Sequence, residues 1–273
     1  MSTLLVVVFL VTALLFVCSG CAAFPDRSHE VRTESVAYQA SGGTCRGYLA
    51  WDGKQQGKRP GVIVVHEWWG LNGYVQKRAR MLAELGYTAF ALDLYGDGKT
   101  ATNPQDAGAL MNDALANMDR TVARFVAAKE LLQDHPTVDR DSIGAIGYCL
   151  GGAIVLGMAR SGMDLDAVVS FHGSLSTDSP AKKGAVKSRV LVCHGAEDPF
   201  VPKQEVEAFQ AEMKAAGVDY RFEAYPGAVH AFTSEEATAN GKRYGLPLRY
   251  DAEADRKSWQ SMQNLFASTW SKQ

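Results

Sequence analysis

The chain has no excess of charge of either sign: its 273 residues include 28 Lys and Arg against 30 Asp and Glu, for a net charge of −2. No basic stripe interrupts this balance, so the composition argues against a nucleic-acid partner. Internal repeats and low-complexity tracts are absent as well. With 47% hydrophobic residues and 26 glycines, the chain has the composition of one globular domain with many tight turns.

The six histidines show no spacing typical of a metal site. Neither H-x-x-x-H nor H-E-x-x-H occurs, so the sequence gives no support for bound zinc, and we expect no cofactor. His66, His172 and His194 each follow an apolar segment. We expect these three to be hydrogen-bonded residues around a cleft.

Cysteines are also few. Cys18 and Cys21 lie in the N-terminal segment, which leaves Cys45, Cys149 and Cys193. An odd number in an exported protein leaves at least one thiol unpaired. Cys45 and Cys193 either form a disulfide or are two small buried hydrophobic residues, and the lack of a characteristic spacing favours the second. Cys149 has no partner at C-x-x-C spacing, which argues against a thiol-redox protein.

No apolar run reaches the length of about 20 residues that a membrane-spanning helix needs. The longest, residues 4–17, is apolar except for Thr12 and has the length of a signal-peptide core. The small residues before Cys21 resemble a bacterial lipoprotein processing site. We therefore predict a signal segment over residues 1–21, a linker over 22–33 and an exported domain over 34–273, attached to a membrane through lipid on Cys21. A plain cleaved signal and an uncleaved anchor are the alternatives.

Two segments of the domain, residues 35–39 and 44–51, alternate apolar and polar residues on either side of a Gly-Gly pair, which predicts an antiparallel hairpin. Further strands, most of them continuous apolar runs typical of strands buried on both faces, are predicted over 62–65, 88–92, 143–146, 167–170, 190–192 and 220–225. Helical spacing occurs over 74–85, 118–132, 153–159, 203–216 and 252–270. This alternation predicts an α/β fold, a mostly parallel central sheet flanked by helices, with its chemistry at the carboxyl ends of the strands.

Gly147-Tyr148-Cys149-Leu150-Gly151 has the G-x-C-x-G form of a nucleophile elbow with cysteine in place of serine. It lies between a predicted strand and a predicted helix, the context in which this motif operates. The glycines let strand and helix pass close to a strained turn, and the positive end of the helix favours a thiolate. We therefore predict that Cys149 is a nucleophile. The alternative is a glycine-rich turn with an incidental buried cysteine.

Two later loops supply an acid and a base. Asp198 follows the predicted strand 190–192 and His230 follows the predicted strand 220–225, so that nucleophile, acid and histidine occur in the order of α/β-hydrolases. Glu197 competes with Asp198. Asp198 precedes a proline, which biases it to an extended conformation and limits how the loop presents its carboxylate. We predict a triad of Cys149, Asp198 and His230.

Over about residues 44–270 the chain resembles the dienelactone hydrolase family. The resemblance rests on His66–Asn72, Leu92–Gly96, Gly147–Gly152 and the loops that carry the acid and the histidine. It implies an α/β-hydrolase fold and hydrolysis of a carboxylic ester or lactone through a thioester on the elbow cysteine.

The resemblance also implies roles for residues beside the nucleophile. Glu67 would contact the resting thiol, keep it protonated, and help to generate the thiolate once substrate binds. The alternative is that Glu67 is only a hydrogen-bonded polar residue at a strand end. The backbone N–H groups of Leu150 and Trp68 would form the oxyanion hole.

The sequence departs from the family where a substrate carboxylate would be held. Ser234 stands where members that act on chlorocatechol-derived lactones have an arginine, and residues 103–117 contain none. A charge-assisted anchor is therefore lost. Aromatic residues instead predict a pocket for a more apolar acyl or alcohol group: Trp68, Trp69, Tyr95 and Tyr148. We expect a monomer with a small-molecule ester or lactone substrate; the alternatives are a non-catalytic binding protein on this fold and a thiol-redox protein.

Overall fold

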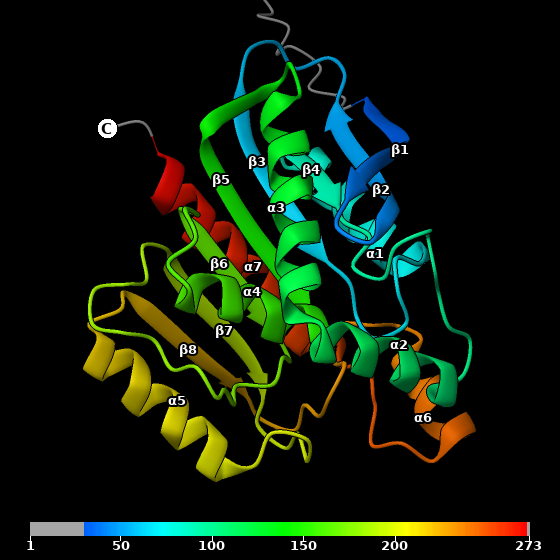
Figure 1. The fold of residues 1–273 in the computed structure, drawn as a ribbon. Helices are drawn as coiled ribbons and strands as arrows, with labels where there is room; N and C mark the ends of the chain where they lie inside the picture. The colour runs from blue at the N-terminus through cyan, green and yellow to red at the C-terminus, as the bar shows by residue number, and fades with distance from the viewer. Residues whose placement is uncertain (1–29, 272–273) are drawn as a thin grey trace, which may run out of the picture.

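The computed structural model describes residues 30–271, which form one eight-stranded sheet with helices against both faces (Figure 1). The strands are β1 (Val31–Ala40), β2 (Gly43–Asp52), β3 (Arg59–Val65), β4 (Thr88–Ala91), β5 (Val138–Tyr148), β6 (Ala167–Phe171), β7 (Arg189–Gly195) and β8 (Tyr220–Tyr225). The helices are α1 (Gly73–Glu84), α2 (Pro104–Ala116), α3 (Met118–Asp134), α4 (Leu150–Arg160), α5 (Lys203–Ala216), α6 (Ala237–Tyr244) and α7 (Ala252–Trp270). The strand order is β1-β2-β4-β3-β5-β6-β7-β8.

The predicted antiparallel hairpin is observed, with β1 paired to β2 from Val31 opposite Asp52 to Ala40 opposite Gly43. β2 continues the sheet by pairing antiparallel with β4. The strand begins earlier than expected, because residues 31–33, which we assigned to the linker, pair with residues 50–52 and so belong to β1. Residues 22–29 of the predicted linker and the signal segment lie outside the described residues.

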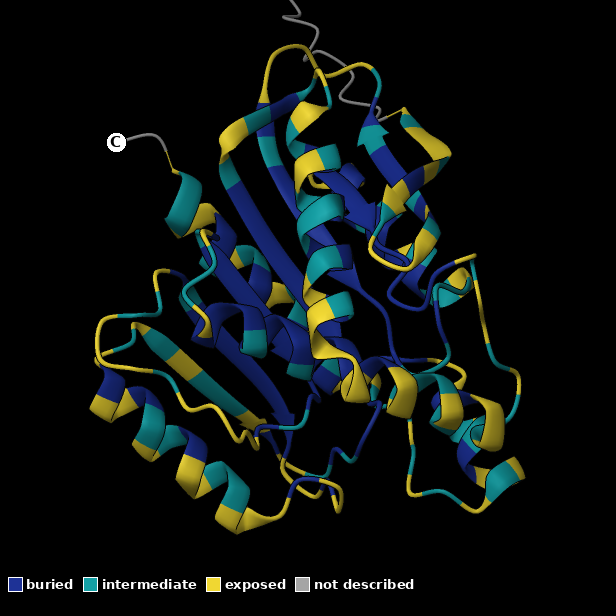
Figure 2. Ribbon diagram, in the orientation of Figure 1, coloured by how far each residue is buried: buried dark blue, intermediate teal, exposed yellow. Residues whose placement is uncertain are grey.

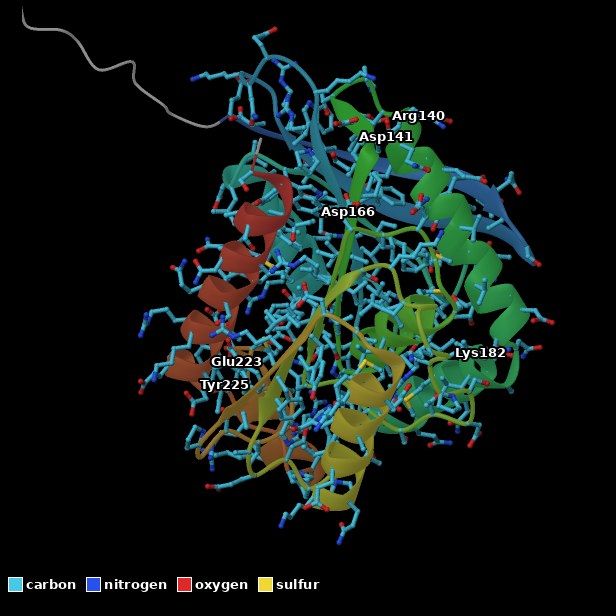
Figure 3. The ribbon with its side chains drawn as sticks, turned by 90° about the vertical axis from the view of Figure 1, so that its left-hand side faces the viewer. Arg140, Asp141, Asp166, Lys182, Glu223 and Tyr225 are labelled. Atoms are coloured by element: carbon cyan, nitrogen blue, oxygen red, sulfur yellow. The ribbon has the colours of Figure 1, made fainter. Side chains whose placement is uncertain are left out.

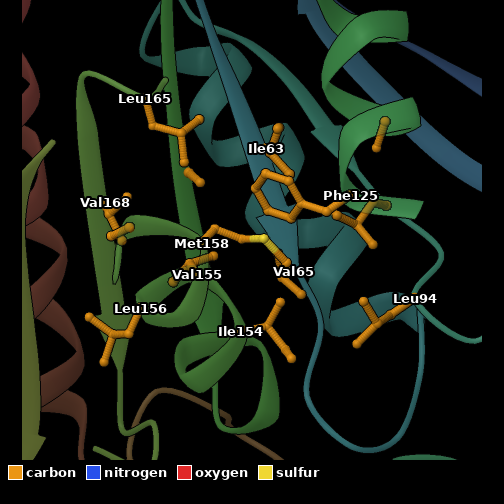
Figure 4. Packing of buried hydrophobic residues seen from close by; sticks show 14 of the residues in the cluster. Ile63, Val65, Leu94, Phe125, Ile154, Val155, Leu156, Met158, Leu165 and Val168 are labelled. Carbon is orange, nitrogen blue, oxygen red and sulfur yellow. The ribbon is translucent and has the colours of Figure 1, made fainter. Parts of the chain in front are cut away.

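The central strands are buried on both faces, as their apolar sequences predict (Figure 2). In β3, Ile63 and Val65 point to one face and Val62 and Val64 to the other, since side chains alternate along a strand. Helices α3, α4 and α5 cover the first face; part of this packing is shown in Figure 4. Helices α1 and α7 cover the second.

Two helices, α2 and α6, were not predicted, and few of their residues are buried. Only Ala107 and Ala114 of α2 are buried, and only Ala237 and Gly241 of α6. A helical period of apolar residues is the signal that reveals a helix from sequence. α6 has none, but α2 has one, with apolar residues at 107, 110, 111, 114 and 115 after the capping residue Asn103. Strand β5 also starts before its predicted range, in a polar stretch that includes the exposed Arg140 and Asp141 (Figure 3).

The strands β3 to β8 run parallel, so their carboxyl ends meet at one edge of the sheet. At the opposite edge, Asp166 accepts hydrogen bonds from the indole N–H of Trp270 at 2.8 Å and from the N–H of Ile143 at 3.1 Å (Figure 3). These bonds attach the end of α7 to the sheet. Within residues 30–271, no helix combines the length and the apolarity needed to cross a membrane.

Candidate active site

Cys149 lies on the sharp turn between β5 and α4. Its φ of 52° is in the left-handed region, which costs a non-glycine residue about 1–3 kcal/mol. The turn is tightly enclosed: a Cβ at Gly147 would lie 2.1 Å from the carbonyl oxygen of Gly151, and one at Gly151 would lie 2.3 Å from that of Val65. Both glycines are therefore required, and the turn holds the half-buried thiol at the carboxyl edge of the sheet.

His230 and Asp198 reach the same edge from the loops after β8 and β7. Nδ1 of His230 lies 2.7 Å from Oδ2 of the fully buried Asp198 side chain. The other carboxylate oxygen accepts the N–H of Phe200 at 2.9 Å, which fixes the carboxylate in place. The competing Glu197 is exposed.

The imidazole of His230 also interacts with Cys149. Burial lowers the pKa of His230, but the charge of a Cys149 thiolate and hydrogen bonds with Asp198 and Cys149 outweigh burial and raise that pKa. Because Nδ1 is engaged by Asp198, the hydrogen bond with Cys149 falls to Nε2. The structure thus brings together the three side chains that the sequence singled out.

The two residues predicted to form the oxyanion hole, Leu150 and Trp68, border the cavity of Cys149. Leu150 is the first residue of α4, where an N–H has no partner within its own helix. Trp68 lies in the loop after β3. Neither N–H donates to another residue in the part of the chain that the structure describes, and both residues line the same cavity as Cys149. Two such donors are what an oxyanion needs.

Glu67 lines the cavity together with Cys149 and His230. Burial raises the pKa of its carboxyl to about 7, against the opposing effect of the positive charges of His230 and Arg78. No hydrogen bond joins the carboxyl to the thiol within the described residues. The role of Glu67 at the thiol therefore stays a prediction.

A cavity of about 720 Å³ opens above the thiol. Its wall is largely apolar, and the lining residues outside the triad include Trp68, Trp69, Met111, Leu115, Phe200, Val201, Leu246 and Leu248. The ring of Phe200 lies edge-on to that of His230 at a centroid distance of 5.0 Å. Glu67 and Asp178 contribute carboxylates, whereas no Lys or Arg is found among the described residues of the wall.

The prediction that Tyr148 lines the pocket is wrong. Strand alternation turns its side chain to the face under α1 and α7, where it is fully buried and stacks on Phe171 at a centroid distance of 4.8 Å. Tyr95 is not part of the cavity wall either. Its hydroxyl donates to the carbonyl of Trp68 at 2.9 Å, so it supports the loop that carries one oxyanion donor. Trp68 and Trp69 do line the cavity, as expected.

Comparison with known proteins now identifies the family. The family model described as "Dienelactone hydrolase family" matches residues 45–270. The chain belongs to the dienelactone hydrolase family. Protein usf of Aquifex pyrophilus is 35% identical to it over 211 residues, which cover 74% of this chain and 88% of that one.

Solved structures agree. A dienelactone hydrolase-like promiscuous phosphotriesterase from metagenomic libraries superposes with a TM-score of 0.82 at 37% identity, covering 88% of this chain and 98% of that chain. A structure named m3DLH gives the same TM-score and coverage at 39% identity. The protein therefore has the α/β-hydrolase fold and is a lactone or ester hydrolase of the dienelactone hydrolase family, which sets aside the non-catalytic alternative.

In this dienelactone hydrolase family member, the cavity wall contains residues that sequence reasoning missed. Met111 and Leu115 come from α2, and Leu246 and Leu248 follow α6. The apolar period of α2 could have revealed that helix, but only the tertiary arrangement shows that residues of both segments line the cavity. Phe200 could have been suspected, because it follows Asp198 in the same loop.

Several other cysteines and histidines of the described residues lie outside the triad. Cys45 and Cys193 are buried free thiols, the reading that the sequence favoured. Nε2 of His66 accepts the N–H of Leu94 at 3.2 Å, in the role of a hydrogen-bonded neighbour. Nδ1 of His194 has no hydrogen-bond partner among described residues, contrary to expectation. In the described part of the chain, no group of three or more His, Cys, Asp or Glu residues could hold a metal ion.

Proposed function

We propose that this hydrolase cleaves a carboxylic ester or lactone through a covalent thioester on Cys149. The observation that carries the proposal is that one cavity is lined by Cys149, by His230 in its contact with Asp198, and by Leu150 and Trp68, whose N–H groups have no partner among the described residues. Nucleophile, oriented base and oxyanion donors are the parts that acyl transfer requires.

In the first half of the reaction, Sγ of Cys149 attacks the carbonyl carbon and its proton passes to Nε2 of His230. Asp198 holds Nδ1 and stabilises the imidazolium. The oxyanion of the tetrahedral intermediate accepts hydrogen bonds from the N–H groups of Leu150 and Trp68. When the C–O bond breaks, the leaving alkoxide takes the proton from His230, and the thioester remains.

In the second half, a water molecule gives a proton to His230 and its hydroxide attacks the thioester carbonyl. The tetrahedral intermediate again uses the two N–H donors. Breaking the C–S bond releases the carboxylic acid, and the Cys149 thiolate recovers its proton from His230. A lactone follows the same course, with the leaving alkoxide still attached to the acyl group.

The cavity wall favours an uncharged substrate with a sizeable apolar group. Its apolar side chains offer van der Waals contact, and its acidic side chains, Glu67 and Asp178, disfavour a substrate carboxylate. No guanidinium is available in the described wall to hold such a carboxylate. We therefore expect p-nitrophenyl butyrate to be hydrolysed with a kcat/KM at least about tenfold above that of p-nitrophenyl hemisuccinate, since 1.4 kcal/mol corresponds to tenfold.

Replacement of the nucleophile tests the function. Cys149→Ala should abolish turnover of p-nitrophenyl acetate while its circular dichroism spectrum stays that of wild type. Cys45→Ala removes a buried thiol away from the cavity and serves as the control, with turnover retained. Turnover by Cys149→Ala at the wild-type rate would refute the proposal.

We also propose that the domain is exported and attached to a membrane through lipid on Cys21. Support comes from the apolar run over residues 4–17 and the small residues before Cys21. These residues lie outside the described part of the chain. Cys21→Ala should move the protein from the membrane fraction to the soluble fraction, and retention in the membrane would indicate an uncleaved anchor instead.

A further inference from the structure

A fully buried histidine lies directly beneath the nucleophile, and the mechanism above does not use it. His172 follows β6 and has a φ of 41°, so a second strained residue adjoins the strained Cys149. Strained conformations persist only where the surroundings fix them. The contacts of His172 show what it fixes.

The ring of His172 connects the two catalytic loops. Nδ1 accepts the N–H of Cys149 at 3.2 Å, a donor that is shared with the carbonyl of Phe171 at 3.0 Å. Nε2 lies 2.7 Å from Oγ1 of Thr233, which stands three residues after His230. One side of the ring thus holds the backbone of the nucleophile, and the other side holds the loop of the base.

The direction of these bonds requires a neutral ring. Nδ1 has to carry a lone pair to accept the N–H of Cys149, so the proton lies on Nε2 and is donated to Thr233. Burial, followed by the positive charges of His230 and Arg78, lowers the pKa of His172 well below its ordinary value. The ring of His172 also packs edge-on against that of His230 at a centroid distance of 5.3 Å.

Thr233 is itself anchored to α1 and α7. Its hydroxyl lies 2.6 Å from that of Tyr74, and its carbonyl accepts a hydrogen bond from Arg78 at 2.6 Å. Arg78 is buried and forms an ion pair with Asp255 at 2.6 Å. The loop of the base is therefore fixed to the core on one side and to His172 on the other.

We propose that His172 and Thr233 are positioning residues that set the distance between Sγ of Cys149 and Nε2 of His230. This inference rests on the proposed function, since it concerns how efficiently that pair reacts. A displacement of about 1 Å in a reacting group can cost about a hundredfold in rate. Loss of the His172–Thr233 hydrogen bond should therefore reduce kcat far more than it changes KM.

Thr233→Val, which keeps the shape but removes the hydroxyl, is the main variant. We expect kcat to fall 10- to 100-fold with KM within about twofold. Thr233→Ser restores the hydroxyl and should recover most of the rate. Tyr74→Phe removes the other buried hydrogen bond to the same oxygen but leaves His172 attached, so its kcat should stay within about threefold of wild type.

His172→Asn provides an independent arm, because Asn tolerates a positive φ and can accept the Cys149 N–H but is too short to reach Thr233. We expect it to match Thr233→Val, and the double variant to be no slower than either single one, because the two residues act through one bond. Equal losses in Tyr74→Phe and Thr233→Val, or additive losses in the double variant, would overturn the inference.

A readout that needs no substrate is the alkylation rate of Cys149. The folded full chain is treated with iodoacetamide, and the modified Cys149 peptide is then measured by mass spectrometry. Thr233→Val should slow this alkylation about tenfold, since His230 no longer supports the thiolate. Tyr74→Phe should not slow it. If Thr233→Val is alkylated slowly but Cys149→Ala hydrolyses ester at the wild-type rate, the proposed function is refuted and the positioning role stands. If Thr233→Val keeps both the alkylation rate and the kcat of wild type, the positioning role alone is refuted.

Discussion

Replacing Glu67 by glutamine should make the protein more stable at alkaline pH. The carboxyl is buried and accepts no hydrogen bond within the described residues, and burial raises its pKa from 4.5 to about 7. The protonated form therefore fits the fold better than the ionised form. Well below pH 4.5 Glu67 is neutral in both the folded and the unfolded chain, and glutamine should have the same stability.

The size of the effect follows from the pKa shift. A rise from 4.5 to about 7 is about 2.5 pKa units, and at 1.36 kcal/mol per unit this corresponds to about 3 kcal/mol of stability. This stability is fully present below the unfolded pKa and is lost as the pH rises through about 7. Glu67→Gln should therefore be about 3 kcal/mol more stable than wild type at pH 8 and equally stable well below pH 4.5.

Urea unfolding of both proteins at several pH values measures this difference. Glu84→Gln, at an exposed position on α1, is the matched control and should follow wild type at every pH. Ester turnover by Glu67→Gln should fall about tenfold at the same time, because the carboxylate lies beside His230 in the cavity. A difference in unfolding free energy that does not change with pH, or a less stable variant at pH 8, would refute the burial argument.

Three further substitutions test separate parts of the site. Asp198→Asn should lower kcat by about 10²- to 10⁴-fold in steady-state assays, because it disturbs the tautomer that the 2.7 Å contact with His230 sets; a loss below threefold would contradict that role. Tyr148→Phe removes a buried hydroxyl that has no hydrogen-bond partner among residues 30–271, so urea unfolding should show equal or up to about 1 kcal/mol higher stability, with turnover unchanged. Tyr95→Phe loses the bond to the Trp68 carbonyl, and its kcat should fall about five- to tenfold; an unchanged kcat would show that this loop needs no such support.

The sequence alone predicted the bounds of those elements whose ends carry a local signal, such as a capping residue. α5 and β8 have the predicted bounds, because Gly217, with a φ of 71°, ends the helix between them. α7 begins as predicted because Asp251 caps it. α6 lacks an apolar period and so escaped prediction, whereas α2 has one over residues 107–115 and a cap at Asn103 that together could have marked it.

The candidate site also has a part that the sequence predicted, the triad, and a part that it did not, the cavity wall. Cys149, Asp198 and His230 follow strand ends, and the parallel topology alone gathers them at one edge. The cavity wall depends on where α2 and the segment after α6 pack, which no local pattern encodes. The prediction for Tyr148 was wrong because it used only the aromatic character of the residue. The alternation of side chains along β5 turns Tyr148 to the face covered by α1 and α7.

Trapping the acyl-enzyme tests the central claim most directly. Enzyme mixed with p-nitrophenyl acetate, quenched in acid within one turnover and digested, should contain the Cys149 peptide with the added mass of one acetyl group, and hydroxylamine should remove that group from it. The Cys45 and Cys193 peptides should remain unmodified, since both thiols are buried away from the cavity. Rapid turnover with no acetyl group on Cys149, or with the acetyl group on another residue, would contradict the thioester mechanism.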